Sequence, residues 1–204
     1  MVFLTGQGQP QRLGVLPGSF NPPTRAHLAL AEAALAEVDQ VVLVLPRAFP
    51  HKNYEGASLP QRAKMLQALA ETNPRLSAAL SAGGLFIEIA RECRAVYGPD
   101  VQLTFVCGRD AAERIIGWKY DSPHAVSQML GVFRLLVACR LGAYQPPAPL
   151  RSQIRGLELP ADYDTVSASE VRRRISEGEP WEHLVPESII PILNEMSGVY
   201  GRSA

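Results

Sequence analysis

A short loop near the start of the chain carries residue types that could hold a phosphate group. Gly18 has no Cβ, so a phosphate can approach its backbone closely, and Ser19 and Thr24 offer hydroxyl groups. If Thr24 is the N-cap of a helix, His27 falls in the first turn, where its imidazole could donate to a phosphoryl oxygen. The alternative is that Thr24 only caps the helix and His27 is a surface histidine. We favour the phosphate site because the loop lies between an apolar run and a helical pattern, and the positive end of a helix attracts anions.

A second candidate anion site lies near the other end of the chain. Ser167 and Ser169 are small hydroxyl residues at the start of a helical pattern, and Arg172 follows in its first turns. Hydroxyl groups, free backbone N–H groups and a guanidinium together suit a polyphosphate. The alternative is that residues 172–174 form only a solvated basic face, the usual explanation of a short charge run.

Three further residues could hold a second substrate that carries a ring. Lys52 follows an apolar run and could contact a phosphate, or it could be a solvated lysine. Asp110 could accept a hydrogen bond from a ribose hydroxyl, although Asp110-x-x-Glu113 also fits a capping box for a helix that starts at Ala111. Trp118 offers a flat face on which a ring could stack, or else it packs in the core.

Alternating strand and helix patterns position these residues. Four apolar runs have the length of buried strands, namely residues 13–16, 41–45, 101–107 and 133–139. Helical patterns separate the runs, which predicts an α/β fold: a Rossmann-like, doubly wound parallel sheet with helices on both faces. Ligands bind such sheets at the carboxyl ends of the strands. The loops that carry the candidate residues should therefore meet at one edge.

Capping signals predict where several helices begin. Ser58-x-x-Gln61 fits a capping box, and Ser122-Pro123 fits an N-cap followed by proline at the first helical position. A further helix is expected within residues 83–97.

The end of the chain contains a C-terminal helical segment over residues 186–193, which should dock on the domain. We expect the chain to be loosely held after Asn194. The length of 204 residues suits one domain with a substantial core. The prediction is a single domain over residues 1–204, with its core at about 11–194.

Charge and cysteine content argue against several classes of protein. Lys+Arg and Asp+Glu both number 20, so the net charge is +0 and no overall field attracts nucleic acid or an anionic membrane. No apolar run approaches the length of a membrane span, and the first ten residues lack the apolar core of a signal peptide. Cys93, Cys107 and Cys139 lack C-x-x-C spacing, and we interpret the last two as buried thiols. This pattern favours the reducing cytoplasm over a disulfide framework or zinc site. The sequence carries no signal for an oligomeric state.

The sequence GSFNPPTRAH, residues 18–27, resembles the G-[ST]-F-[ND]-P-x-[HT]-x-x-H signature of the nucleotidyltransferase superfamily. Within the superfamily the chain resembles the nicotinate/nicotinamide mononucleotide adenylyltransferases. Thr24 and His27 occupy the two motif positions, and Thr24 replaces the commoner first histidine. Residues 166–172 are similar to the family's I-S-S-T-x-[IV]-R motif, with Ala168 in place of the second serine. Gly108-x-Asp110 followed by Trp118 resembles the family's G-x-D…W pattern.

The resemblance implies an enzyme that joins ATP to a pyridine mononucleotide and releases pyrophosphate. A divalent cation, Mg²⁺ carried by the triphosphate, would assist and needs no metal site of protein ligands. The implied roles are as follows: Gly18, Ser19, Phe20 and Thr24 at the triphosphate, His27 at the α-phosphate, Ser167, Ser169 and Arg172 at the outer phosphates, and Lys52, Asp110 and Trp118 at the mononucleotide.

The likeness is incomplete, and alternatives remain open. Residues 81–87 lack the serine-tyrosine-threonine stretch whose polar groups help to hold the substrate in bacterial members of the family. The chain could therefore use another phosphate acceptor, or CTP in place of ATP. The missing hydroxyl at Ala168 would also fit a regulator that binds a nucleotide without turnover. A redox Rossmann protein is disfavoured because Gly14 and Gly18 have the wrong spacing for the dinucleotide fingerprint.

Overall fold

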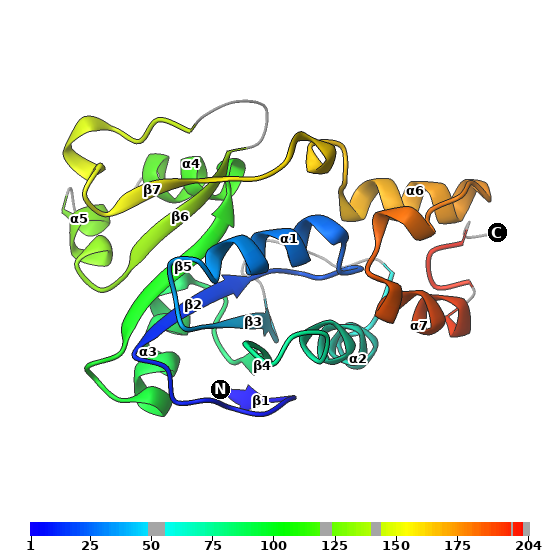
Figure 1. Cartoon of the computed structure of the whole chain (residues 1–204), viewed down its shortest axis with the longest axis horizontal. Coiled ribbons are helices and arrows are strands. Elements are labelled where there is room, and N and C mark those ends of the chain that lie inside the picture. The colour runs from blue at the N-terminus through cyan, green and yellow to red at the C-terminus, as the bar shows by residue number, and fades with distance from the viewer. Residues whose placement is uncertain (49–55, 119–123, 140–143, 197, 202–204) are drawn as a thin grey trace.

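A seven-stranded sheet forms the centre of the molecule (Figure 1). The computed structural model describes residues 1–48, 56–118, 124–139, 144–196 and 198–201. The strand order is β1-β4-β3-β2-β5-β6-β7, and all neighbours are parallel except β1, which pairs antiparallel with β4. The strands are β1 (Val2–Phe3), β2 (Arg12–Pro17), β3 (Gln40–Pro46), β4 (Leu76–Ser81), β5 (Gln102–Gly108), β6 (Arg134–Cys139) and β7 (Ile154–Glu158).

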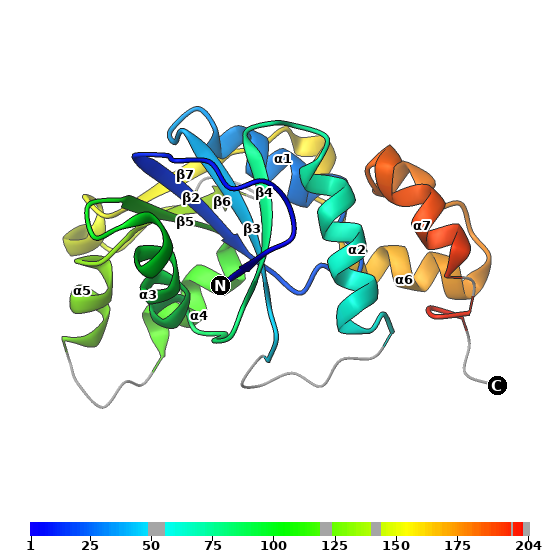
Figure 2. The same ribbon diagram turned by 90° about the horizontal axis from the view of Figure 1, so that it is seen from below.

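Helices cover both faces of this sheet, as Figures 1 and 2 show. One core contains side chains of α1, α2, α6 and α7, and the other contains side chains of α3, α4 and α5. The helices are α1 (Arg25–Ala34), α2 (Leu59–Ala70), α3 (Phe86–Tyr97), α4 (Arg109–Gly117), α5 (Ala125–Leu130), α6 (Ala168–Glu177) and α7 (Ile190–Glu195), and the short 3-10 turns are η1 (Ala148–Leu150), η2 (Ala161–Tyr163), η3 (Glu182–Leu184) and η4 (Glu187–Ile189). This arrangement confirms the predicted doubly wound α/β fold.

The central strands are apolar throughout because each supplies both cores. In β3, Val41, Leu43 and Leu45 pack into the core that contains α1, whereas Val42 and Val44 pack into the core that contains α3. All five side chains are fully buried. A strand that is covered on both faces needs no polar residue at alternate positions, which is why the apolar runs predicted the central strands.

The four predicted strands correspond to β2, β3, β5 and β6, but the prediction missed the other three. β4 has the sequence LSAALS, whose alanines and serines form no apolar run. Ser77 and Ser81 are nevertheless buried in it. β7 reads IRGLE with only its Ile and Leu buried, and β1 has two residues.

The helix starts were predicted with mixed success. Ser58 is the N-cap of α2, and its backbone N–H donates to Gln61 Oε1 at 2.8 Å, which confirms the capping box. The expected cap at Asp110 is wrong, because α4 already begins at Arg109 and Asp110 lies exposed in its first turn. Residues 122 and 123, expected to start the next helix, lie outside the described residues, and α5 is described from Ala125.

The C-terminal segment is held more firmly than expected. The predicted docking helix is η4 followed by α7, and Pro191 lies in the first turn of α7, where a missing N–H costs little. The expectation that the chain is loose after Asn194 is wrong at Tyr200, which is only 7% exposed and belongs to the core that contains α1. Figure 1 shows α6 and α7 beyond the arrowhead of β2, so this part of the chain lies beside the carboxyl edge of the sheet.

The three cysteines form no disulfide with one another, and they differ in burial. Cys93, Cys107 and Cys139 are free thiols. Burial raises the pKa of Cys93 and of Cys107 to about 12, whereas Cys139 is half-buried rather than buried as expected. Within the described ranges, none of the helices is both long enough and apolar enough to cross a membrane.

Candidate active site

The start of α1 holds the imidazole of His27 in one orientation. Thr24 is the N-cap, with extended φ and ψ of −124° and 166°, and His27 lies three residues later. The backbone N–H of Thr24 donates to His27 Nδ1 at 3.0 Å, and Thr24 Oγ1 lies 2.8 Å from the same nitrogen. A backbone N–H can only donate, so Nδ1 must accept. The neutral ring therefore carries its proton on Nε2.

This geometry gives Thr24 a more specific role than a hydroxyl contact to phosphate. Its side chain is fully buried, and Oγ1 faces the imidazole. Thr24 is thus both the helix cap and the residue that fixes the ring of His27, and the phosphate role of the pair stays a prediction.

Phe20 shapes the loop that precedes α1. Its backbone has φ of 46°, in the left-handed region that few residues other than glycine adopt, and its side chain is fully buried. The ring lies 5.1 Å from the ring of His27, centroid to centroid. A Cβ on Gly18 would lie 3.0 Å from the ring of Phe20. A side chain at position 18 would therefore crowd the ring of Phe20, and Phe20 itself can offer a ligand only backbone groups.

Two other segments of the chain, β3 and α2, hold this loop. The N–H of Gly18 donates to the carbonyl of Val44 at 3.0 Å, and Arg62 from α2 donates to the carbonyl of Ser19 at 3.2 Å. Arg62 is 4% exposed, so the side chain that holds the carbonyl of Ser19 is buried. The loop is built in advance of any ligand, which reduces the cost of ordering it on binding.

Arg172 joins the second predicted motif to the first. Its Nη1 donates to the carbonyl of Asn21 at 2.7 Å, and its Nη2 donates to Ser169 Oγ at 3.2 Å. Asn21 and Arg172 are 151 positions apart in the chain. The structure therefore brings the loop of Ser19 and the start of α6 together, and the binding of phosphate by either segment stays a prediction.

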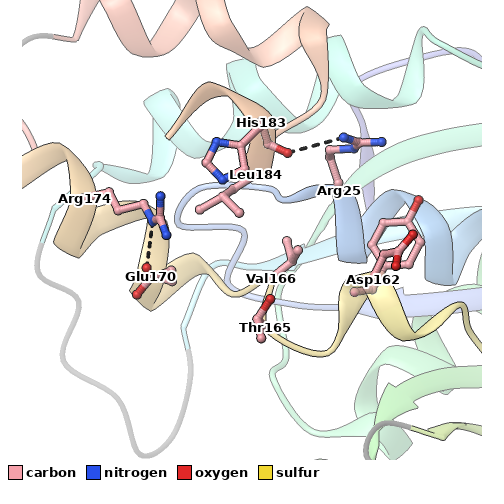
Figure 3. Close-up of a pocket in the computed structure, with 9 residues that line it drawn as sticks. Arg25, Asp162, Thr165, Val166, Glu170, Arg174, His183 and Leu184 are labelled. Carbon is pink, nitrogen blue, oxygen red and sulfur yellow. Dashed lines mark hydrogen bonds and ion pairs between the residues drawn. The ribbon is translucent and has the colours of Figure 1, made fainter. Parts of the chain in front are cut away.

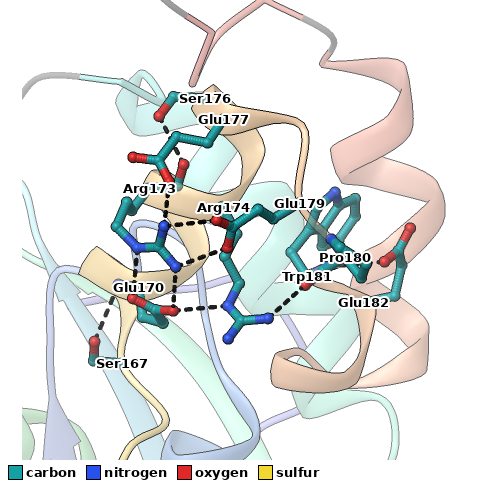
Figure 4. Close-up of polar contacts among 10 residues, drawn as sticks. All are labelled: Ser167, Glu170, Arg173, Arg174, Ser176, Glu177, Glu179, Pro180, Trp181 and Glu182. Atoms are coloured by element: carbon teal, nitrogen blue, oxygen red, sulfur yellow. Dashed lines mark hydrogen bonds and ion pairs between the residues drawn. The ribbon is translucent and has the colours of Figure 1, made fainter.

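Ser167 caps α6, and Arg173 and Arg174 bond to groups of the same helix and of the turn that follows it (Figure 4). Ser167 Oγ accepts the N–H of Glu170 at 3.1 Å. Arg173 bonds to Glu170, Glu177 and Glu179, and Arg174 bonds to Glu170 and to the carbonyl of Pro180.

Hydrogen bonds from Arg173 and then Arg174 lower the pKa of Glu170 to about 2. These groups are at the surface, where ion pairs contribute little to stability. The hypothesis of a solvated basic face thus fits Arg173 and Arg174, but Arg172 faces the loop.

The candidates for the second substrate are less well defined. Lys52 lies outside the described residues. Asp110 is exposed in α4, which starts at the carboxyl end of β5. Trp118 follows α4 and is 52% exposed, so the alternative of core packing is wrong. Leu85, at the carboxyl end of the sheet before α3, is a second exposed apolar residue, at 49%.

Acidic side chains already occupy the backbone N–H groups of the loop before α3. Glu92 accepts from Ala82 and Gly83, and Glu88 accepts from Gly84 and Leu85, at 3.0 to 3.2 Å. Burial opposes the charge of Glu92, but the N–H of Gly83, the N-terminal ammonium and the N–H of Ala82 together lower its pKa. The departure from the family pattern at residues 81–87 therefore coincides with a loop whose donors are bound internally.

A cavity lies between the start of α1, α6 and η3. It has a volume of about 650 Å³, and Arg25, Glu170, Arg174 and His183 are among its lining residues (Figure 3). Arg25 Nη1 donates to the carbonyl of His183 at 3.4 Å. Two positions along a helix amount to a rotation of about 200°, so Arg25 and His27 point to opposite sides of α1. This cavity is therefore separate from the surface that His27 faces.

The fold and the two joined loops define a nucleotidyltransferase, and the chain belongs to the cytidylyltransferase-like family, whose model matches residues 15–174. The curated relatives place it among the adenylyltransferases. The proteins of Moorella thermoacetica and Salinispora arenicola named "Probable nicotinate-nucleotide adenylyltransferase" are 30% and 31% identical to this chain. The alignment with the Moorella protein covers 89% of this chain and 88% of that protein. The alignment with the Salinispora protein covers 85% of this chain and 93% of that protein. The chain is thus an adenylyltransferase.

A solved structure supports the fold independently. The nicotinic acid mononucleotide adenylyltransferase of Plasmodium falciparum, in complex with NaAD, matches with a TM-score of 0.67. The match covers 90% of this chain and 95% of that one. Because the identity is 15%, this likeness establishes the shared architecture and leaves the ligand as a property of that protein.

Proposed function

We propose that this enzyme transfers the adenylyl group of ATP to nicotinate or nicotinamide mononucleotide and releases pyrophosphate. The observation that carries the proposal is the contact of Arg172 with the carbonyl of Asn21, which joins the two phosphate motifs at one place beside the oriented imidazole of His27. The names of the relatives support the choice of acceptor. We further propose that residues 1–204 act as one nucleotidyltransferase domain in the cytoplasm, a location that suits three free thiols.

In the proposed reaction an oxygen of the mononucleotide phosphate attacks the α-phosphorus of ATP. A new P–O bond forms, the bond between the α-phosphorus and the bridging oxygen breaks, and pyrophosphate carries away the electron pair. No protein nucleophile takes part, so the residues position two polyanions and neutralise developing charge. Mg²⁺ would arrive with the triphosphate and offset charge on its oxygens. Within the described residues, no group of three His, Cys, Asp or Glu side chains gathers as a metal site.

The chain's own residues divide this work. Nε2 of His27, which carries the proton, donates to an oxygen of the α-phosphate, and Thr24 holds the ring in that orientation. Gly18 and Ser19 lie along the triphosphate, with Phe20 shaping their backbone. The outer phosphates meet Ser167 and Ser169 at the start of α6, together with Arg172, and Lys52, Asp110 and Trp118 are assigned to the mononucleotide.

A pyrophosphate-release screen tests the proposal directly. ATP and CTP are each paired with nicotinate mononucleotide, nicotinamide mononucleotide, phosphopantetheine and other phosphate acceptors. We expect release with ATP and a pyridine mononucleotide, with the matching dinucleotide as product. Release only with another acceptor would replace the substrate assignment. Binding of ATP without release for any acceptor would identify a regulator that does not turn over.

Replacing Trp118 tests the acceptor site separately. Trp118 is 52% exposed, so Trp118→Ala should leave the core unchanged. Stacking on an aromatic face contributes about 0.5–1.5 kcal/mol, so the mononucleotide Kd should rise about 2- to 10-fold while ATP binding is unchanged.

Isothermal calorimetry with each ligand alone, on wild type and variant, measures both effects. Val2→Ala is a matched control, since Val2 is exposed to the same 52% but lies on β1 at the edge of the sheet. Equal mononucleotide affinity in the wild type and Trp118→Ala would remove Trp118 from the site.

A further inference from the structure

Asn21 is the centre of a buried group of contacts, and the proposed reaction gives no role to its side chain. Asn21 is 5% exposed. Its Oδ1 accepts the hydroxyl of Tyr200 at 2.7 Å and the backbone N–H of Ala57 at 3.2 Å. Its backbone carbonyl accepts Arg172 at 2.7 Å. Three segments that are far apart in the sequence therefore meet on Asn21. This residue lies in the loop before α1 that we assign to the triphosphate, residues 18–24, called the phosphate loop below.

Tyr200 reaches this position from the end of the chain, 179 residues after Asn21. Its ring is packed against Gly56, where a Cβ would lie 2.7 Å from Tyr200 Cε1. Gly56 also has φ of +94°, which residues with a side chain rarely adopt. Burial raises the pKa of Tyr200, so its hydroxyl stays protonated and donates at physiological pH.

The geometry points to Tyr200 as a positioning residue: we propose that its hydroxyl, through Asn21, holds the phosphate loop and the anchor of Arg172 in the geometry that binds ATP. The proposal rests on the proposed function, since it assigns a means of control to the same site. Asn21 Oδ1 accepts two hydrogen bonds, and the backbone carbonyl of the same residue accepts one from the guanidinium of Arg172. A shift of Asn21 therefore moves the point on which Arg172 is anchored.

The consequence is specific to one substrate. Arg172 and the loop of Gly18 and Ser19 are assigned to the triphosphate, whereas Trp118 is assigned to the mononucleotide. Loss of the Tyr200 hydroxyl should raise the KM for ATP and lower kcat, with the KM for the mononucleotide unchanged. A residue that only stabilised the fold would lower the melting temperature without this split.

The experiment compares Tyr200→Phe with Tyr97→Phe. Phenylalanine keeps the ring that packs on Gly56 and removes only the donor. Tyr97 is a half-buried tyrosine at the end of α3, beside the other core, and serves as the matched control. We expect kcat/KM for ATP to fall about five- to tenfold in Tyr200→Phe and to stay within twofold of wild type in Tyr97→Phe.

Two further measurements separate positioning from general stability. Hydrogen exchange should quicken in the peptide that contains residues 18–24 in Tyr200→Phe, and not in Tyr97→Phe. In a double-mutant cycle, Tyr200→Phe should have little further effect on kcat/KM for ATP once Arg172→Ala is present, because both act on the same anchor. Wild-type kinetics and loop exchange in Tyr200→Phe, or equal effects of Tyr200→Phe in both backgrounds, would overturn the proposal.

These measurements also separate a failure of the positioning role from a failure of the proposed function. If the wild type releases no pyrophosphate, the function fails, but ATP affinity by calorimetry and exchange in residues 18–24 still report on Tyr200. Unchanged ATP affinity and exchange in Tyr200→Phe would then overturn the positioning role. If the wild type is active and Tyr200→Phe matches it, the positioning role alone fails.

Discussion

His27→Ala should lower kcat by about 10²–10³ while the protein stays folded. The expectation follows from one donor atom: Nδ1 accepts the N–H of Thr24, so the proton lies on Nε2 and can meet charge that develops on the α-phosphate. Alanine removes that donor and also the acceptor for the N–H of Thr24. Loss of a helix cap costs about 0.5–2 kcal/mol, so a small fall in melting temperature is expected beside the kinetic loss.

Pyrophosphate release and thermal unfolding are measured together on the same preparation. His183→Ala is the matched control, because His183 is exposed and contacts Arg25 through its backbone carbonyl, which alanine retains. Its side chain also lines the cavity on the side of α1 opposite to His27. The control should keep near-normal kcat. A folded His27→Ala enzyme with near-normal turnover would show that this imidazole plays no part in the transition state.

The strands could be predicted where buried positions are filled by large apolar residues. β3 is buried along its whole length by large apolar residues, and its boundaries were close to those expected. β4 is almost as buried, but it lies next to the short strand β1 and fills its space with Ala78, Ala79 and two serines. Small residues bury little apolar area each, so periodicity and hydropathy carry almost no signal there.

The residues of the candidate site could be predicted from the sequence, but the orientation and the partners of their side chains could not. Spacing placed Thr24 and His27 at a helix start, but only the structure shows that the hydroxyl of Thr24 is buried against the imidazole. Asn21 lay inside the recognised signature, yet its partners Ala57 and Tyr200 are 36 and 179 residues away. Contacts between residues so far apart in the sequence depend on how the chain packs, and no local sequence pattern predicts them.

Arg172→Ala should lower kcat/KM for ATP by about 10- to 100-fold. A hydrogen bond to a charged group contributes about 1.5–3 kcal/mol, and here the guanidinium bonds both to the carbonyl of Asn21 and to Ser169 Oγ. Alanine removes the positive charge that we propose binds the outer phosphates, and it releases the loop from α6. Arg172→Lys keeps the charge but not the fork of donors, so its loss should be intermediate.

Arg174→Ala is the matched control, since Arg174 is on the same helix and carries the same charge. It bonds to Glu170 and to the carbonyl of Pro180, contacts that hold the end of α6 and the following turn. We expect a lower melting temperature and a change in kcat/KM within about threefold, because surface ion pairs contribute about 0–1 kcal/mol. Steady-state kinetics on the three variants gives the comparison. Equal losses for Arg172→Ala and Arg174→Ala would mean that residues 172–174 act as one solvated basic face, and the assignment of Arg172 to the phosphates would be wrong.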